Sequence, residues 1–186
     1  MTNEIVYEDE FLSVEKDQNT GWRFVRTTDA AAVLVYVPAL DSILVVSQQR
    51  PPMISAENPS GKSIEAVAGR LDYNVGVKKL IANELKEEAG ISVEAEVISL
   101  LNFGKPLASS SGFATEKKYL GYVEVEVSQI ENLDNLDQSY GNRHEGENIE
   151  RSLIKVKDLE KTEFQDVVLF ALVQWFLKNY HNRSSA

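Results

Sequence analysis

The chain of 186 residues contains no cysteine, only two histidines and an acid excess that leaves it short of positive charge. Without cysteine there is no disulfide framework, no thiolate zinc site and no cysteine nucleophile, and a reducing compartment suits the chain. Lysine and arginine number 19 against 29 aspartates and glutamates, a formal net charge of −10. That balance argues against nucleic acid or an anionic membrane as the main partner, because little would neutralise their phosphates. Any chemistry must come from oxygen, imidazole or a metal.

Targeting signals and long apolar runs are also missing. Residues 1–10 are acidic and lack the basic region and apolar stretch of a secretory peptide, so we expect a cytoplasmic protein. The most apolar segment, 167–177, is interrupted by Gln174 and is too short to span a bilayer. The length and a hydrophobic content of 43% favour one globular domain with a small extension.

Short segments with strand character dominate the sequence. Residues 18–21 separate two alternating segments and are typical of a hairpin turn. The polar segment 51–61 is a loop of the kind that often carries function. The expected strands cover residues 11–15, 22–26, 32–37, 42–47, 63–68, 91–101, 119–127 and a short apolar segment at 149–156. Those at 32–37 and 42–47 are continuously apolar, which favours burial on both faces.

Two helices are expected among these strands. The apolar spacing predicts one helix over 77–89, opened by Asn74 or Gly76 and ended by Gly90. A second, longer helix is expected over 163–180. Strands interrupted by one central and one terminal helix predict a mixed α+β architecture.

Three glutamates gather on one border of the central helix. At about 100° per residue, Glu84, Glu87 and Glu88 share a sector beside the apolar face. The face directed to solvent instead holds Lys79, Asn83 and Lys86. Clustered carboxylates repel one another unless a cation joins them, and their oxygens suit magnesium, manganese or calcium better than zinc. Taken alone, however, this spacing favours a partly solvated acidic helix.

Gly69, fifteen residues before Glu84, places this helix in a wider pattern. Together with residues 84–91, E-L-K-E-E-A-G-I, it resembles the signature box of the Nudix hydrolases, a glycine-containing loop and a helix ending R-E-U-x-E-E-x-G-U, where U is aliphatic. Two positions differ, because the family's glutamate six residues after the first glycine is Val75 and its arginine is Asn83. In the family both are largely ion-pairing positions, so losing both leaves no charge stranded.

Four segments resemble one branch of that family, the ADP-ribose and nucleoside diphosphate sugar pyrophosphatases. Segment 45–50 is similar to a strand ending in Q-x-R, and 64–69 to an E-x-x-A-G segment that leads into the box. Segment 111–116, S-G-F-A-T-E, resembles a stretch of the branch that contains serine and glycine and ends in glutamate, and 145–150 resembles an acidic loop E-x-E-x-I-E. The resemblance covers about residues 20 to 180.

The resemblance implies a fold and an assembly. It implies a Nudix fold, an α/β/α sandwich with a mixed sheet, over residues 30–182, followed by a tail at 183–186. It also implies an N-terminal β arm over residues 1–29, a small antiparallel sheet that builds a homodimer.

The implied activity is Mg²⁺-dependent hydrolysis, with Mn²⁺ as a substitute, of a nucleoside diphosphate sugar such as ADP-ribose or GDP-mannose to a nucleoside monophosphate and a sugar phosphate. The matching positions make metal ligands of Glu84, Glu87, Glu88 and the backbone carbonyl of Ala68. They make Glu145 the catalytic base, with Glu147 as a second candidate or a further metal ligand. Without the resemblance, Glu145 and Glu147 would be read as solvated loop charges.

Three residues are candidates for substrate binding. Arg50 would contact phosphate, since a guanidinium pairs with two oxygens, although a surface ion pair is a serious alternative. Glu116 matches the branch and would support the site, but it could equally form a salt bridge with Lys117 or Lys118. Trp22 could stack on a base, although an aromatic residue on a strand is more often part of a core or an interface.

Two other functions stay open. One is hydrolysis of a dinucleotide or a nucleoside triphosphate by the same chemistry. The other is a catalytically weak protein that senses a nucleotide sugar, which the missing box arginine would suit.

Overall fold

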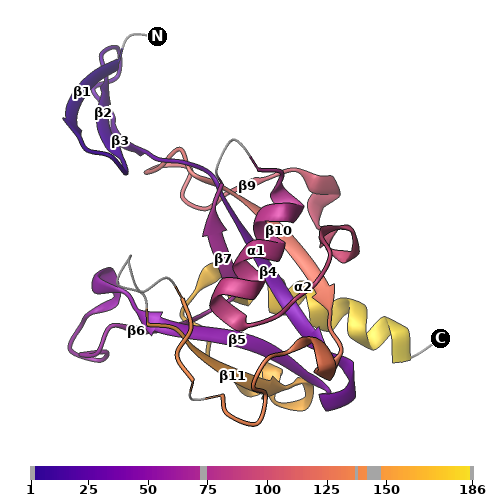
Figure 1. The fold of residues 1–186 in the computed structure, drawn as a ribbon. Coiled ribbons are helices and arrows are strands. Elements are labelled where there is room, and N and C mark those ends of the chain that lie inside the picture. The colour runs from indigo at the N-terminus through magenta and orange to yellow at the C-terminus, as the bar shows by residue number, and fades with distance from the viewer. Residues whose placement is uncertain (1–2, 72–74, 137, 142–147, 185–186) are drawn as a thin grey trace.

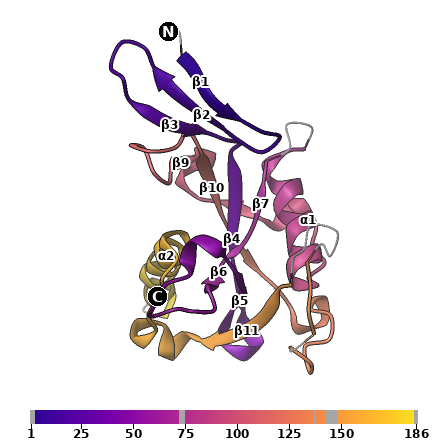
Figure 2. The same ribbon diagram turned by 90° about the vertical axis from the view of Figure 1, so that its left-hand side faces the viewer.

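The N-terminal residues form a small antiparallel sheet that projects from the body of the molecule (Figures 1 and 2). The computed structural model describes residues 3–71, 75–136, 138–141 and 148–184, and side chains as far as His181. The small sheet has the order β1-β2-β3, formed by β1 (Asn3–Glu8), β2 (Ser13–Asp17) and β3 (Arg23–Arg26). The predicted hairpin is therefore confirmed, and β1 is an additional strand that the sequence did not predict.

The turn between β2 and β3 is held by Asp17. Its Oδ1 accepts hydrogen bonds from the backbone N–H of Asn19 and Thr20 and from the Thr20 hydroxyl, at 2.7 to 3.1 Å. Gly21 follows with a φ of +72°, a conformation that glycine adopts without strain. Aspartate and glycine at these places explain why the chain reverses here.

A buried carboxylate joins all three strands of the small sheet. Glu15 accepts hydrogen bonds from Arg26 and from the Asn3 amide, the latter at 2.6 Å. These donors lower the pKa of Glu15 to about 2, the Arg26 guanidinium contributing most. The ion pair therefore stabilises the sheet fully above the ordinary glutamate pKa, and this stabilisation is lost as the pH falls through 2.

The main body contains an eight-stranded mixed sheet. Its central order is β11-β5-β4-β10-β8, and β6, β7 and β9 pair with β5, β4 and β10 respectively. Only β10 and β4 run parallel; the other pairs are antiparallel. The strands are β4 (Ala30–Val37), β5 (Ser42–Gln49), β6 (Lys62–Glu65), β7 (Val67–Arg70), β8 (Ser99–Leu100), β9 (Leu107–Ala108), β10 (Lys117–Glu124) and β11 (Glu150–Lys155). Mixed α+β architecture, as predicted, is what the chain adopts.

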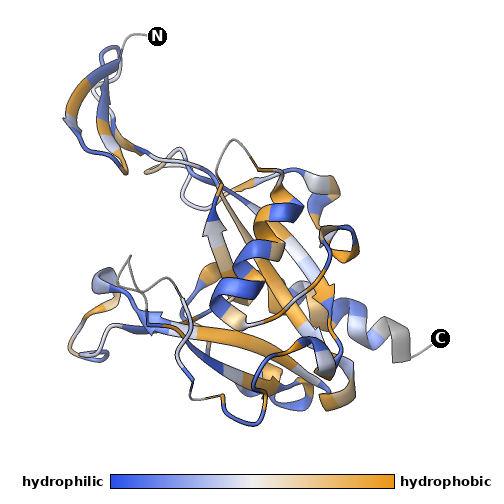
Figure 3. Cartoon of the chain, viewed as in Figure 1, coloured by the Kyte–Doolittle hydropathy of each residue, from blue (hydrophilic) through white to orange (hydrophobic). Residues whose placement is uncertain are grey.

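Two helices cover opposite faces of this sheet (Figure 2). Side chains of β4 alternate between the layers, so that Val33 packs on the side of α1 (Val77–Ala89) and Leu34 on the side of α2 (Val167–Ser184). All eight residues of β4 are buried, and the central strands carry the hydrophobic colour in Figure 3. The continuously apolar segments therefore are strands covered on both faces, as predicted.

Local capping residues set where α1 stops and where α2 starts. Gly76 precedes α1, and Gly90 ends it with a φ of +60°, which confirms the predicted glycine cap. The prediction that α2 begins at residue 163 is wrong, because Asp166 Oδ1 accepts the backbone N–H of Leu169 at 2.6 Å and the helix starts after this cap. Neither helix in the described part of the chain is long and apolar enough to cross a membrane.

Two predicted strands are wrong in extent. Segment 63–68 divides at Ala66 into β6 and β7, because each half pairs with a different strand of the sheet. Of segment 91–101, only β8 is a strand, because the 3₁₀ helix Ala95–Val97 occupies the residues before it. Short 3₁₀ helices lie in several connections: Pro38–Leu40, Pro51–Met53, Ala95–Val97, Asn102–Gly104, Val127–Gln129 and Val156–Lys161.

Candidate active site

Gly69 on β7 lies directly against the carboxylate of Glu84 on α1. A Cβ atom added to Gly69 would lie 2.0 Å from Glu84 Oε1 and 2.2 Å from its Cδ. Contacts that short do not occur, so only glycine leaves room for the half-buried Glu84 side chain in its present position. The close approach accounts physically for the fifteen-residue spacing between the glycine and the first glutamate of the box.

One turn further along α1, Glu88 is bonded to the residue before Gly69. Its side chain is 4% exposed, and Oε2 accepts the backbone N–H of Ala68 at 3.0 Å. A buried carboxylate is costly unless such donors compensate for its lost hydration. Glu84 and Glu88 thus lie against two consecutive residues of β7, and Glu88 is hydrogen-bonded to the first of them.

Glu87 departs from the predicted grouping. It is exposed, whereas Glu84 is half-buried and Glu88 is buried, so the three carboxylates do not share one environment. Position 87 lies one residue short of the strip that faces β7, which explains why its side chain reaches solvent. The opposite face of α1 is exposed at Lys79, Asn83 and Lys86, as predicted.

The two positions that differ from the family's box have ordinary surroundings. Val75 is half-buried and packs against the core beside α1, where an apolar side chain is favoured over a carboxylate. Asn83 is exposed on the helix. Neither substitution leaves a buried charge unpaired.

The donor chemistry of this site fits a hard divalent cation. Glu84, Glu88 and the carbonyl of Ala68 are oxygen donors on two adjoining elements, and Mg²⁺ and Mn²⁺ prefer such oxygens. Within the described residues, no group of three or more histidine, aspartate or glutamate side chains is already gathered as a metal centre. Glu84 and Glu88 are therefore the side chains that the fold brings to β7, and Glu87 lies outside their contact.

Arg50 follows β5 and forms a two-pronged ion pair with Glu65 of β6. Its Nε and Nη2 donate to the two carboxylate oxygens of Glu65 at 3.0 and 2.7 Å. Arg50 remains 42% exposed, whereas Glu65 is 15% exposed. Arg50 therefore forms the ion pair that was the alternative to phosphate binding, and its contact with phosphate stays a prediction. Glu65 was not predicted as the partner of Arg50, although both residues belong to motifs that resemble the same branch.

Glu116 forms the salt bridge weighed as its alternative. Glu116 Oε2 lies 3.4 Å from Lys118 Nζ and accepts the Ser109 hydroxyl at 2.8 Å. Of the two predicted partners, Lys117 and Lys118, it is Lys118 that forms the salt bridge with Glu116. A role for Glu116 in substrate binding stays a prediction.

Trp22 precedes β3 and connects the small sheet to the segment 110–115. Its Nε1 donates to the carbonyl of Gly112 at 3.1 Å, while its ring is 61% exposed. Backbone bonds from Val25 to Phe113 and from Thr115 to Val25, at 2.8 and 2.9 Å, continue this connection. The ring is accessible for stacking, but its base contact stays a prediction.

The two candidate bases, Glu145 and Glu147, lie outside the described residues. The residues next to that segment are placed, however. The backbone N–H of Gly141 donates to the carbonyl of Glu87 at 3.1 Å. Gly141, the last described residue before the acidic segment, therefore lies at the end of α1 that carries the glutamates.

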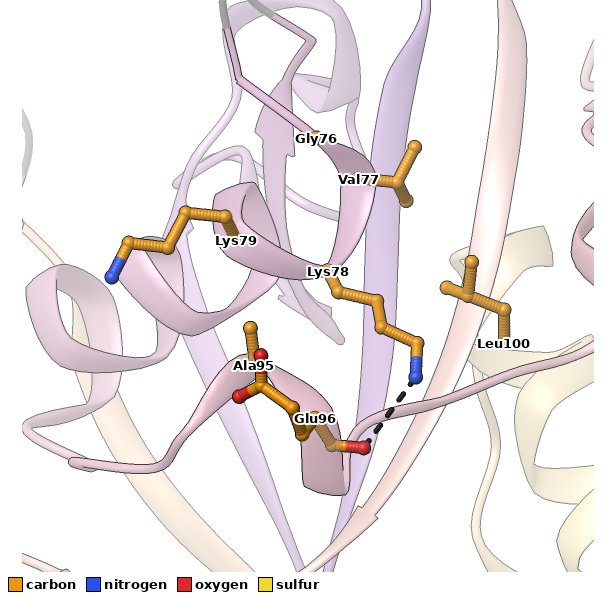
Figure 4. A pocket seen from close by; sticks show the side chains of 7 residues that line it. All are labelled: Gly76, Val77, Lys78, Lys79, Ala95, Glu96 and Leu100. Atoms are coloured by element: carbon orange, nitrogen blue, oxygen red, sulfur yellow. Dashed lines mark hydrogen bonds between the residues drawn. The ribbon is translucent and has the colours of Figure 1, made fainter.

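An open groove lies at the opposite end of α1 (Figure 4). Its lining includes Val77, Lys78 and Leu100, and Lys78 Nζ donates to the carbonyl of Glu96 at 3.4 Å. Among the residues that the structure describes, none of those predicted for the site lines this groove. Its basic and apolar lining gives it a different character from the carboxylate site.

A scan against protein-family models found no match, and a search of curated proteins found none either.

Proposed function

We propose that this protein is a Nudix-type pyrophosphatase that hydrolyses a nucleoside diphosphate sugar to a nucleoside monophosphate and a sugar phosphate. One observation carries the proposal: the glycine and the helix of the box-like pattern meet, with Glu84 filling the space that Gly69 leaves and Glu88 bonded to Ala68. An acidic helix that served only solubility would have no need for either contact.

The proposed roles follow from the chemistry of a pyrophosphate, whose anionic oxygens repel a nucleophile. Glu84, Glu88 and the carbonyl of Ala68, joined by Glu87 after a side-chain rotation, would hold Mg²⁺ or Mn²⁺. Bound there, the cation would neutralise phosphate oxygens and acidify the attacking water. Glu145, or Glu147, would accept the proton of that water.

Arg50 would bind the phosphate by exchanging one carboxylate oxygen for a phosphate oxygen. Its pairing with Glu65 holds the guanidinium in one orientation before substrate arrives, which lowers the entropy lost on binding. Because Arg50 is 42% exposed, substrate can reach it without unfolding the strand end.

The function is tested by a metal-dependent assay over ADP-ribose, GDP-mannose, UDP-glucose, diadenosine compounds and nucleoside triphosphates. Products are resolved in ¹⁸O-labelled water, which identifies the phosphorus attacked. We expect turnover of a nucleotide sugar that requires Mg²⁺ or Mn²⁺. Preference for diadenosine compounds or triphosphates would instead support the related hydrolase activity, and tight binding without turnover would support the sensor.

Gly69→Ala is expected to lower kcat by about 10²-fold while changing the free energy of unfolding by less than about 1 kcal/mol. The new methyl group takes the place of the Glu84 carboxylate, and this half-buried, flexible side chain can turn outward at little cost to folding. Steady-state kinetics and urea denaturation measure the two effects.

Gly76→Ala is the matched control, since a Cβ atom at Gly76 meets nothing within 4 Å. It should leave kcat within about twofold of the wild-type value. If Gly69→Ala and the wild-type protein had equal kcat values, Glu84 would have no part in the active site.

The small sheet supports the proposal of a homodimer. Five apolar residues on or beside its strands are each more than half exposed: Ile5, Val6, Tyr7, Phe11 and Trp22. Apolar groups gathered in so small a sheet are typical of a surface that another chain covers. We expect the mass of a dimer by light scattering, and a rise of at least about tenfold in the dissociation constant for Val6→Glu. Val127→Glu, a similar change on the body, should leave the mass unchanged; a monomeric wild-type protein would contradict the proposal.

A further inference from the structure

Arg151 on β11 is a buried cation that contacts no carboxylate among the described residues. It is 4% exposed, and its Nη1 donates to the carbonyls of Ala89 and Glu131 at 2.7 and 2.9 Å. Nη2 donates to the carbonyl of Asn132 at 3.3 Å, while Nε is buried and finds no acceptor in the described part of the chain. Burial lowers the pKa of this guanidinium. A buried charge of this kind is a poor source of stability, because an apolar side chain would fill the space at lower cost.

The carbonyls that Arg151 binds belong to the end of the carboxylate helix. Ala89 is the last residue of α1, and its carbonyl is one of the groups that a helix end leaves without an intrahelical partner. The partial negative charge at a helix C-terminus attracts a cation. Glu131 joins the same place through its backbone N–H, which donates to the carbonyl of Gly90 at 2.9 Å.

The guanidinium of Arg151 also stacks on the ring of Tyr140, at 4.1 Å from the ring centre. The position of this ring depends on Gly90, where a Cβ atom would lie 2.6 Å from Tyr140 Cε1. Tyr140 pairs with Ile149 through two backbone hydrogen bonds, of 2.8 and 3.0 Å. These two residues enclose the acidic segment, so Tyr140 and Ile149 bring its two ends together.

We propose that Arg151 is a positioning residue that fixes the base of the acidic segment to the carboxylate end of α1. It contacts both parts directly, and the bond from Gly141 to the carbonyl of Glu87 adds a second connection between them. Held in this way, Gly141 and Ile149, on either side of the acidic segment, keep a constant relation to the carboxylate end of α1. Arg151 touches neither substrate nor metal in this role, which rests on the proposed function.

The test compares Arg151→Ala and Arg151→Lys with the wild-type protein, with and without guanidinium ions at tens of millimolar. We expect Arg151→Ala to lower kcat by about 10- to 100-fold with KM changed less than about threefold. Guanidinium should restore at least about fivefold of the lost kcat by filling the vacated site, and Arg151→Lys should retain more activity than Arg151→Ala. Arg23→Ala, on the small sheet, should neither lose activity nor respond to guanidinium.

Hydrogen exchange gives a second readout that needs no turnover. In Arg151→Ala the amides of Gly141 and Ile149 should exchange at least about tenfold faster, while those of β4 keep their protection. Unchanged kcat in Arg151→Ala, or a loss that guanidinium and lysine leave unrelieved, would overturn the proposal. So would unchanged exchange at Gly141 and Ile149. If the wild-type protein turned over no substrate, the proposed function would fail, and the exchange would still decide whether Arg151 holds this segment.

Discussion

Glu145→Gln is expected to lower kcat by about 10²- to 10⁴-fold while the fold stays intact. Glutamine has nearly the same shape as glutamate but cannot accept the proton of the attacking water at neutral pH. The sequence predicts that Glu145 lies in a loop, and such a position would suit the role, because a loop can bring a carboxylate to the water when substrate is bound. Single-turnover and steady-state kinetics on the preferred nucleotide sugar measure the effect, and the circular dichroism spectrum checks the fold.

Glu147→Gln is the informative companion to this variant. Two residues away, it removes one charge from the same segment, so it reports the effect of charge alone. A near-normal kcat for Glu145→Gln, with a large loss for Glu147→Gln, would transfer the role of base to Glu147. The pH profile of kcat should lose its acidic limb only in the variant that removes the base.

Glu88→Gln is expected to lower kcat by about 10²- to 10³-fold and to raise the Mg²⁺ concentration needed for half-maximal activity. The amide oxygen of glutamine can still accept the backbone N–H of Ala68, so the buried hydrogen bond persists. The free energy of unfolding should therefore change by less than about 1 kcal/mol. What is lost is the negative charge, and with it the affinity for a cation.

Glu94→Gln provides the control for Glu88→Gln. Glu94 is exposed and lies beyond the end of α1, so its neutralisation changes the net charge by the same amount away from the site. A similar loss of kcat in both variants would mean that overall charge, rather than the carboxylate against β7, governs activity. Metal titration of each variant by calorimetry separates the two explanations.

Much of the fold could be predicted because its pattern is local. Strand β4 and the centre of β5 are continuously apolar because helices cover both of their faces. Gly90 ends α1 at the residue where a left-handed conformation is needed. The division at Ala66 could not be predicted, because each side of it looks equally suited to a strand. The choice of β5 for one half and β4 for the other is made by the whole sheet.

The candidate site was predictable to the extent that it rests on spacing along one helix and one strand. The contact of Glu84 with Gly69 agrees with that spacing, whereas the exposure of Glu87 depends on the rotation of α1 against β7. Arg151 was missed because no motif contains it. Its only signal was a charged residue on the side of a strand that Ile149 and Leu153 also share, where an apolar side chain would be usual.

The parallel pairing of β4 with β10 affects how the chain folds. Ala30 pairs with Lys118, so the centre of the sheet closes only after β10 has been synthesised. Until then, one edge of β4 presents unpaired backbone groups beside a row of apolar side chains. Closing so long a loop is slow, because the entropy of closure is lost before the contacts that offset it have formed. Refolding at high concentration should therefore favour aggregation over the native state, and a nascent chain that stops short of β10 should depend on chaperones.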